Sequence, residues 1–296
     1  MAFCVFVTRM SVMKVCHVVE IVTPKRFLLK GLWFGPKKPK RAIVWIHGLS
    51  GSVFSNIRYL TKILDGKTAV LTFNNRGHDI VSGVRRANGA FGLFGGEVHE
   101  VFTDCLDDIE GAVRFTRRSR AKDIFVGGSS TGSQKTVYWA SRTKSLRNIR
   151  GLILAVPLSD YASTVHLRGR AKTAHAVKIA RMLVRKGKRR QLLPQGLWHQ
   201  PFDAQRFVSL YSGEGAEEIF TYWDSKRQPK TLRKITKSVL VLLAGKDEYS
   251  DRPAKEIAAW FEKHLRSGKV VIVPHVKHSF RGAEKQVARM IRQWMK

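Results

Sequence analysis

Short apolar runs recur along this sequence and are separated by longer segments with helical periodicity. The later runs are apolar at consecutive positions rather than at alternate ones, which is typical of parallel strands buried on both faces of a sheet. Strands are predicted over residues 15–21, 27–33, 42–46, 69–73, 124–128, 151–156, 238–244 and 270–273. Helices are predicted over residues 55–64, 97–118, 133–145, 252–266 and 281–295. This alternation predicts an α/β fold with a doubly wound, mostly parallel sheet.

The alternation is interrupted between the runs at 151–156 and 238–244. The intervening stretch is far longer than an ordinary crossover connection, and it contains a basic helical pattern at 173–189. We therefore predict a core built from residues 1–157 and 237–296, with a helical cap inserted at 158–236.

Two adjacent serines lie between the predicted strand at 124–128 and the helix that follows it, in the sequence GSSTG. The pattern G-x-S-x-G in this context is typical of a sharp strand-to-helix turn that lifts a nucleophilic serine clear of the sheet. Residues two positions before and after the nucleophile must be small, because the backbone folds back on itself there. Ser130 has glycine at both positions, whereas Ser129 would have the β-branched Thr131 at one of them. We predict Ser130 as the nucleophile, with Ser129 as the alternative.

A serine hydroxyl needs a base, and the base needs a carboxylate to orient it. In α/β folds of this kind the acid and then the base follow later strands. The run at 238–244 is followed by Asp247, Glu248 and Asp251. We predict Asp247 as the acid because it comes soonest after the strand, with Glu248 as the next candidate.

The last predicted strand, 270–273, is followed by His275 and His278. His278 lies further into the loop, directly before a helix, so its side chain can swing back toward Ser130. His275 adjoins Pro274 at the strand end and is the weaker candidate. We therefore predict His278 as the general base.

The strand at 42–46 ends in the glycine-containing turn HGLSGS. Acyl transfer through a serine requires backbone donors aimed at the oxyanion that develops. The N–H of Leu49 in this turn can face the N–H of Thr131, which directly follows the nucleophile. We predict that these two residues form the oxyanion hole.

Several other polar residues are expected to have structural rather than catalytic or metal-binding roles. Arg76, in the segment FNNRGHD, is expected to brace neighbouring loops, with contact to a substrate carboxylate as the alternative. Cys105 lies in an acidic segment that would raise the pKa of its thiol, which argues against a nucleophilic role. His78 and Asp79 are adjacent and cannot make a metal site alone. No metal and no cofactor is predicted.

The chain is strongly basic, with 54 Lys and Arg against 22 Asp and Glu and a formal net charge of +32. Such a field attracts nucleic acid, anionic lipid or acidic substrates. The basic residues are spread along the chain, with a concentration at 181–190, and no zinc-finger, RNP or Walker pattern accompanies them. We expect a merely basic surface, with an anion-binding or membrane-binding patch as the alternative.

Features that bear on location favour the cytoplasm. No stretch approaches the roughly 18 to 20 apolar residues of a membrane span. The apolar start MAFCVFV lacks a preceding basic region and is cut short by Arg9, so it makes a poor secretory signal. Three scattered cysteines offer neither a disulfide framework nor a metal pair, which fits a reducing compartment.

With these residues the sequence resembles the α/β-hydrolase superfamily over nearly its whole length, and most closely serine esterases of the siderophore-esterase-like branch. In that branch the turn often reads G-H-S-T-G followed by Ser or Cys and then Gln, and here it reads GSSTGSQ. The segments FNNRGHD, SGVRRANG, PFDAQRFVSLYS and AGKDEY are also similar.

The resemblance implies the same roles for Ser130, Asp247 and His278, and it places Leu49 and Thr131 at the oxyanion hole. The sequence departs from the branch at Ser129, where a histidine is usual, and in its basic cap. The substrate does not carry over, because cap and loops determine it.

The expected function is therefore hydrolysis of a small-molecule carboxylic ester through an acyl-enzyme, without a cofactor. Cleavage of a thioester, lactone or amide by the same residues remains open. A non-catalytic basic scaffold that binds nucleic acid or anionic membrane is the rival from another class. A haloalkane-type enzyme would need an aspartate in place of Ser130.

Overall fold

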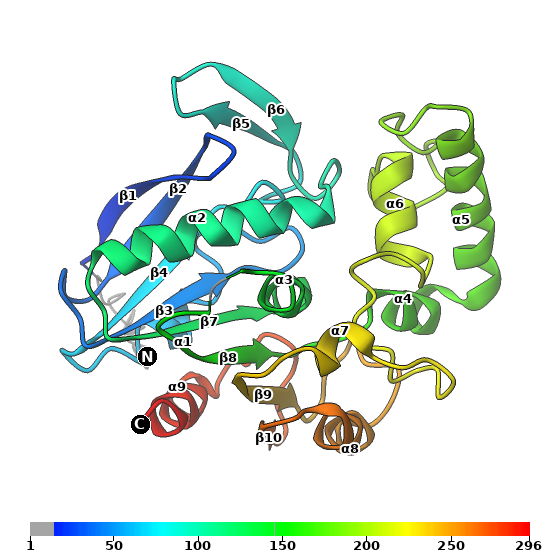
Figure 1. Cartoon of the computed structure of the whole chain (residues 1–296). Coiled ribbons are helices and arrows are strands. Elements are labelled where there is room, and N and C mark those ends of the chain that lie inside the picture. Colours follow the sequence, from blue (N-terminus) through cyan, green and yellow to red (C-terminus); the bar gives the residue numbers. More distant parts are fainter. Residues whose placement is uncertain (1–14, 145) are drawn as a thin grey trace, which may run out of the picture.

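The computed structural model describes residues 15–144 and 146–296, so the apolar N-terminal segment discussed above lies outside the described residues. A single mixed sheet forms the centre of this part of the chain (Figure 1). Its strands are β1 (His17–Val22), β2 (Phe27–Phe34), β3 (Arg41–Ile46), β4 (Thr68–Phe73), β5 (Ser82–Arg86), β6 (Phe91–Gly95), β7 (Asp123–Ser129), β8 (Ile149–Ala155), β9 (Ser238–Ala244) and β10 (Gly268–Val273).

The strands are ordered β10-β9-β8-β7-β3-β4-β2-β5-β6, and β1 pairs with β2. Pairing is parallel from β10 through β4 and antiparallel among the remaining strands. The prediction of a mostly parallel α/β sheet is confirmed. Because the carboxyl ends of parallel strands meet at one edge, the loops after β3, β7, β8, β9 and β10 are brought together.

The sequence prediction missed the hairpin of β5 and β6, which extends the antiparallel edge of the sheet (Figure 1). Its strands carry glycines and arginines and are partly exposed, so they lack the buried apolar run that marks a central strand. Gly89 turns the chain between them with a φ of 85°, a conformation that favours glycine.

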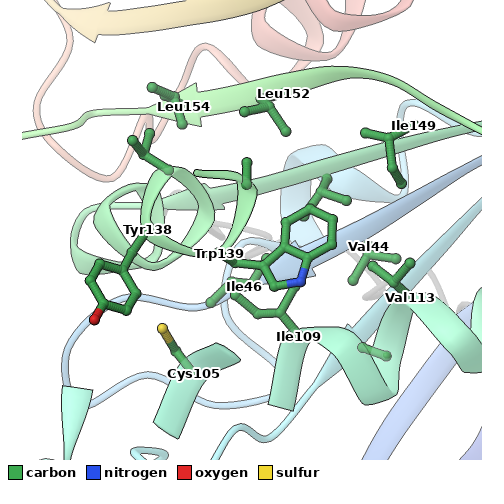
Figure 2. Close-up of a cluster of buried hydrophobic side chains, with 14 of the residues drawn as sticks. Val44, Ile46, Cys105, Ile109, Val113, Tyr138, Trp139, Ile149, Leu152 and Leu154 are labelled. Atoms are coloured by element: carbon green, nitrogen blue, oxygen red, sulfur yellow. The ribbon is translucent and has the colours of Figure 1, made fainter. Parts of the chain in front are cut away.

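Helices cover both faces of the sheet. One face carries α2 (Cys105–Arg118), α3 (Thr131–Ala140) and α8 (Ala254–His264), and the other carries α1 (Ile57–Leu60) and α9 (Glu284–Trp294). Figure 2 shows Cys105, Ile109 and Val113 of α2 gathered with Tyr138 and Trp139 of α3. The strand residues of this cluster are Val44, Ile46, Ile149, Leu152 and Leu154.

The prediction of one helix from residue 97 placed the start of α2 too early. A short 3-10 turn over Phe102–Asp104 comes directly before α2. Val101, the residue before this turn, has an extended backbone with φ −99° and ψ 104°, which is not helical. Residues 97–101 therefore form a loop, and this loop carries Glu97 and Glu100 toward the cap.

The long insertion forms α4 (Asp160–Arg168), α5 (Arg170–Arg185), α6 (Ala204–Tyr211) and α7 (Lys230–Arg233). Helices α4 to α6 lie together at one side of the sheet (Figure 1). Residues of α5, α6 and the loop between them form a hydrophobic cluster separate from the sheet, which includes Ala180, Trp198 and Phe207. Farther along, Phe220 and Leu232 pack into the main core instead. The cap boundaries at 158 and 236 stay a prediction.

Buried charges join this cluster to the core. Arg206 of α6 is fully buried and forms ion pairs with Glu217 at 2.7 Å and with Glu100 at 2.8 Å. Glu100 also pairs with Lys135 of α3, which is 1% exposed. Each buried charge therefore has a partner of opposite sign, which offsets the cost of removing it from water.

Within the described chain, none of the helices combines the length and the apolar character needed to cross a bilayer.

Candidate active site

Ser130 lies at the turn between β7 and α3. Its backbone has φ 54° and ψ −127°, outside the regions that non-glycine residues normally occupy. The turn is held in this conformation because the Ser130 N–H donates to Ala155 O at 2.9 Å and its carbonyl accepts from Ser133 N at 2.8 Å. Strain of this kind persists only where surrounding structure enforces it, and it is common at catalytic turns.

Close backbone contacts explain the glycines on either side of this turn. A Cβ at Gly128 would lie 2.4 Å from the carbonyl oxygen of Gly132. A Cβ at Gly132 would lie 2.3 Å from the carbonyl oxygen of Ile46, in β3. The chain folds back tightly enough that neither position has room for a side chain.

Ser129 is distinguished from Ser130 by both backbone and contacts. It is the last residue of β7 and is 7% exposed. Its Oγ donates to Asn56 Oδ1 at 2.6 Å, and the same oxygen accepts from Trp45 Nε1 at 3.1 Å. The hydroxyl of Ser129 therefore has a structural partner.

Asp247 and His278 meet between the loops that follow β9 and β10. The distance from His278 Nδ1 to Asp247 Oδ2 is 2.8 Å. The other carboxylate oxygen, Oδ1, accepts from the Tyr249 N–H at 3.1 Å. Both side chains are largely buried, at 16% and 11% exposure. This arrangement fixes the imidazole with Nε2 as its free nitrogen.

The weaker candidates for the acid and the base, Glu248 and His275, make no contact of this kind. The Glu248 carboxylate accepts from the backbone N–H of His278 at 2.9 Å, so it supports the loop rather than the ring. His275 is exposed and is not among the residues that line the cavity beside Ser130. The ring of Tyr249 packs edge-on against that of His278, with 4.9 Å between centroids.

The loop after β3 approaches the turn from the other side. A Cβ at Gly48 would lie 3.0 Å from Ser130 Cβ, so the backbone of this loop is against the serine. Among the described residues, neither the Leu49 N–H nor the Thr131 N–H has a hydrogen-bond partner in the protein. Leu49 lines the cavity beside Ser130, whereas Thr131 is fully buried and does not line it, so the pairing of these two N–H groups as an oxyanion hole stays a prediction.

His47 stabilises the loop that follows β3. It is 2% exposed, and its Nδ1 is 2.8 Å from Gly48 O. Because a carbonyl can only accept, Nδ1 carries the proton. Burial, reinforced by the nearby Lys135 cation, lowers the pKa of His47 to about 3. His47 is thus a neutral structural donor.

Ser130, His278 and Leu49 line one cavity of about 500 Å³. The cap supplies much of its remaining wall, including Asp160, Leu167 and Arg168 from α4 and His199 and Gln200 from the loop before α6. The sequence prediction assigned none of these residues, because only the folded cap places them near β7.

Two buried carboxyl groups face this region. Asp160 accepts from Gln134 Nε2 at 2.5 Å, and burial, together with the nearby Glu217 and Glu218 carboxylates, raises its pKa well above the usual range. Glu97 is hydrogen-bonded to Ser50 and Gln200, and burial raises its pKa as well. Both carboxyl groups therefore ionise less readily than exposed ones.

Arg76 and Cys105 have the structural roles expected from the sequence. Arg76 donates from Nε to Asp108 at 2.8 Å and from Nη2 to Asp107 at 3.1 Å, which joins its loop to α2. Cys105 is buried, and burial raises the pKa of its thiol well above the usual value. Neither residue lines the cavity beside Ser130.

Among the described residues, no group of three or more His, Cys, Asp or Glu side chains is placed to hold a metal ion. His78 instead contacts its neighbour, with Nδ1 2.8 Å from Asp79 Oδ2.

Comparison with solved structures gives matches along nearly the whole chain. A siderophore hydrolase from Aspergillus fumigatus has 16% identity and a TM-score of 0.65, with 97% of this chain and 97% of that chain covered. Est1E from Butyrivibrio proteoclasticus, solved with ferulic acid, has 18% identity and a TM-score of 0.62, covering 94% of this chain and 97% of that one. A monoglyceride lipase from Saccharomyces cerevisiae has 14% identity and a TM-score of 0.63, covering 97% and 96%.

These likenesses establish the fold, which is that of the α/β hydrolases. No curated protein is detectably similar in sequence. A family model described as "Protein of unknown function (DUF1749)" matches residues 29–295, almost the entire chain. The chain therefore belongs to the DUF1749 family, and it has the α/β-hydrolase fold.

Proposed function

We propose that this protein is a serine hydrolase that cleaves a carboxylic ester with Ser130 as nucleophile, His278 as general base and Asp247 as the orienting acid. The observation that carries the proposal is the 2.8 Å contact between His278 Nδ1 and Asp247 Oδ2. His278 also lines the same cavity as Ser130. The contact with Asp247 leaves Nε2 of the ring free.

In the first half-reaction, Ser130 Oγ attacks the acyl carbon and its proton passes to His278 Nε2. The oxyanion of the tetrahedral intermediate accepts from the Leu49 and Thr131 N–H groups. The carbon–oxygen bond to the alcohol then breaks, and the alcohol leaves with the proton from His278. Asp247 holds the ring in place and stabilises the imidazolium each time it forms.

In the second half-reaction, His278 takes a proton from water, and the resulting nucleophile attacks the acyl-enzyme. The bond to Ser130 Oγ breaks and the serine recovers its proton from His278, which releases the acid. No step requires a metal or a redox cofactor. Thioesters, lactones and small amides present the same acyl carbon and differ in the leaving group.

The solved relatives support an ester substrate, since they are named as a siderophore hydrolase, an esterase with ferulic acid and a monoglyceride lipase. At identities of 14% to 18%, they do not identify which ester. Cap residues Leu167, Arg168 and His199, which line the cavity, are the side chains in a position to select it.

The test compares wild type, Ser130→Ala and Ser129→Ala on p-nitrophenyl esters of graded acyl length, with labelling by a fluorophosphonate probe. We expect Ser130→Ala to lose labelling and at least about 10³-fold in kcat, while Ser129→Ala keeps both within a few-fold. Retained activity in Ser130→Ala together with its loss in Ser129→Ala would reverse the assignment. A wild type that neither reacts with the probe nor cleaves any ester would favour the non-catalytic scaffold.

A further inference from the structure

One segment of the cap is entirely without carboxylates. Residues 161–202 contain ten Lys and Arg residues and no Asp or Glu. This cationic cap segment spans most of α4, all of α5 and the loop before α6, and α5 is the rightmost helix in Figure 1. An ordinary solvated helix face mixes positive and negative side chains, whereas this segment carries positive ones alone.

Few of these cations are neutralised by other parts of the chain. Arg181 pairs with Glu214 at 2.7 Å, and Arg190 pairs with Asp203 at 3.0 Å. The other eight have no carboxylate within ion-pairing distance among the described residues, and all are exposed. They are Arg168, Arg170, Lys172, Lys178, Arg185, Lys186, Lys188 and Arg189.

The packing of α5 leaves this charge facing solvent. Its buried side is formed by small and apolar residues, among them Ala176, Ala180 and Leu183, which pack in the cluster shared with α6. One flank of the helix borders a groove of about 370 Å³. Its charged side chains are Arg170, Lys178, Arg181 and Arg185, together with the Glu214 carboxylate that pairs with Arg181, so three of the four cations are not neutralised there. A hollow of this size with converging cations suits a phosphate or carboxylate head group.

Exposed apolar side chains are interspersed with the cations. Leu167 is 47% exposed, Met182 is 39% exposed and Leu192 is 46% exposed. Leu167 and Arg168 also line the cavity beside Ser130, so the same surface continues to the mouth of the site.

We propose that the cationic cap segment docks on an anionic lipid bilayer, with its Lys and Arg side chains over the head groups and Leu167, Met182 and Leu192 inserted beneath them. Basic residues interleaved with apolar ones are typical of interfacial helices. Nucleic acid would use the charge but not the exposed aliphatic side chains. The aromatic rings of the segment are poorly placed to stack on bases, because Trp198 and Phe202 are buried and Tyr161 packs against Trp223. The proposal concerns location at a surface and does not depend on the reaction at Ser130.

The test is cosedimentation of the full chain with phosphatidylcholine vesicles that contain or lack phosphatidylserine. We expect binding to the anionic vesicles only, weakened by salt. In the test variant, four unpaired cations of the segment are changed to glutamine: Lys178, Lys186, Lys188 and Arg189. Since each cation near an anionic membrane contributes about five-fold, this variant should bind at least about 100-fold more weakly.

The matched control removes the same charge from exposed lysines elsewhere: Lys37, Lys38, Lys122 and Lys285, each changed to glutamine. It should bind within about three-fold of wild type, because these lysines lie outside the docking surface. Leu192→Gln should weaken binding without altering net charge. Circular dichroism and thermal unfolding check that each variant is folded.

Three results would overturn the proposal. The first is absence of binding to anionic vesicles at low salt. The second is equal loss of binding in the test and control variants, which would reduce the effect to net charge. The third is tighter binding of duplex DNA than of vesicles, with Leu192→Gln unaffected, which would identify the segment as a polynucleotide surface.

Discussion

Ser129 Oγ donates a hydrogen bond to Asn56 Oδ1, with 2.6 Å between the atoms. This contact joins the residue before the nucleophile to a residue in left-handed conformation, φ 66°, at the start of α1. Trp45 donates to the same oxygen. Ser129 is therefore part of a local network that joins β7, β3 and α1.

Ser129→Ala should lower the free energy of unfolding by about 1 kcal/mol, because the Asn56 oxygen loses one of its two donors. Ester hydrolysis should stay within a few-fold of wild type. Urea unfolding and kcat/KM measure the two effects. In a double-mutant cycle with Asn56→Ala, the two changes should be non-additive, and strict additivity would show that the contact contributes nothing.

Asp247→Asn should lower kcat by about 10⁴-fold, because the amide cannot hold His278 in the tautomer that leaves Nε2 free. The matched control is Glu248→Gln, which alters only the acceptor for the His278 backbone N–H. We expect the control to stay within about ten-fold of wild type. If Glu248→Gln lost most of its kcat while Asp247→Asn stayed near wild type, Glu248 would be the acid.

Gly128→Ala should destabilise the fold by about 2 kcal/mol or more and abolish hydrolysis, since its Cβ would lie 2.4 Å from Gly132 O. Gly83→Ala is the control, because the nearest atom to its added Cβ is 3.8 Å away. Thermal unfolding and activity should be near wild type for the control. A stable, active Gly128→Ala enzyme would contradict the geometry described for the turn.

Glu217→Gln should cost about 3 kcal/mol of stability, because Arg206 is fully buried and loses a paired charge. Glu214→Gln removes the partner of Arg181 in an exposed pair and should cost less than about 1 kcal/mol. Denaturant unfolding monitored by tryptophan fluorescence distinguishes them. Equal effects would mean that the buried network does not stabilise the junction between α6 and the core.

The stability should also depend on pH through His47, whose pKa is lowered from 6.5 to about 3. Above pH 6.5 the ring is neutral in both states and contributes no dependence. As the pH falls below 6.5, only the unfolded chain takes up the proton, so the folded state is progressively destabilised. Between pH 6.5 and about pH 5 the loss is about 2 kcal/mol.

His47→Gln isolates this effect. The amide retains a donor for Gly48 O but does not titrate, so the variant should lack the part of the acid dependence that belongs to His47. Unfolding free energies of both proteins at several pH values provide the comparison. Parallel pH profiles for variant and wild type would contradict the neutral, buried state of this histidine.

The parallel half of the sheet was predictable from sequence, since its strands are continuous apolar runs that only a doubly covered sheet can bury. The edge hairpin of β5 and β6 was missed because its glycines and exposed arginines carry no such pattern. The prediction of Ser130 rather than Ser129 likewise needed only local sequence, because backbone sterics at the turn require the two flanking glycines.

Contacts between distant residues could not be predicted in this way. Ser129 and Asn56 are separated by 73 positions, and nothing in their spacing marks them as partners. The contributions of Leu167, Arg168 and His199 to the cavity depend on how the cap folds over the core. The position of these cap residues follows from packing between distant segments, which the residue pattern within one segment does not encode.

The ion pairs of Arg206 with Glu100 and Glu217 also bear on how molecules reach Ser130. A cap anchored through desolvated charges cannot swing aside at low cost, because each separated ion would need a new partner or water. We therefore expect the mouth of the cavity, which the exposed side chains of Leu167 and Tyr249 line, to keep a nearly constant width. Changing the size of those side chains is accordingly the direct way to alter which molecules pass.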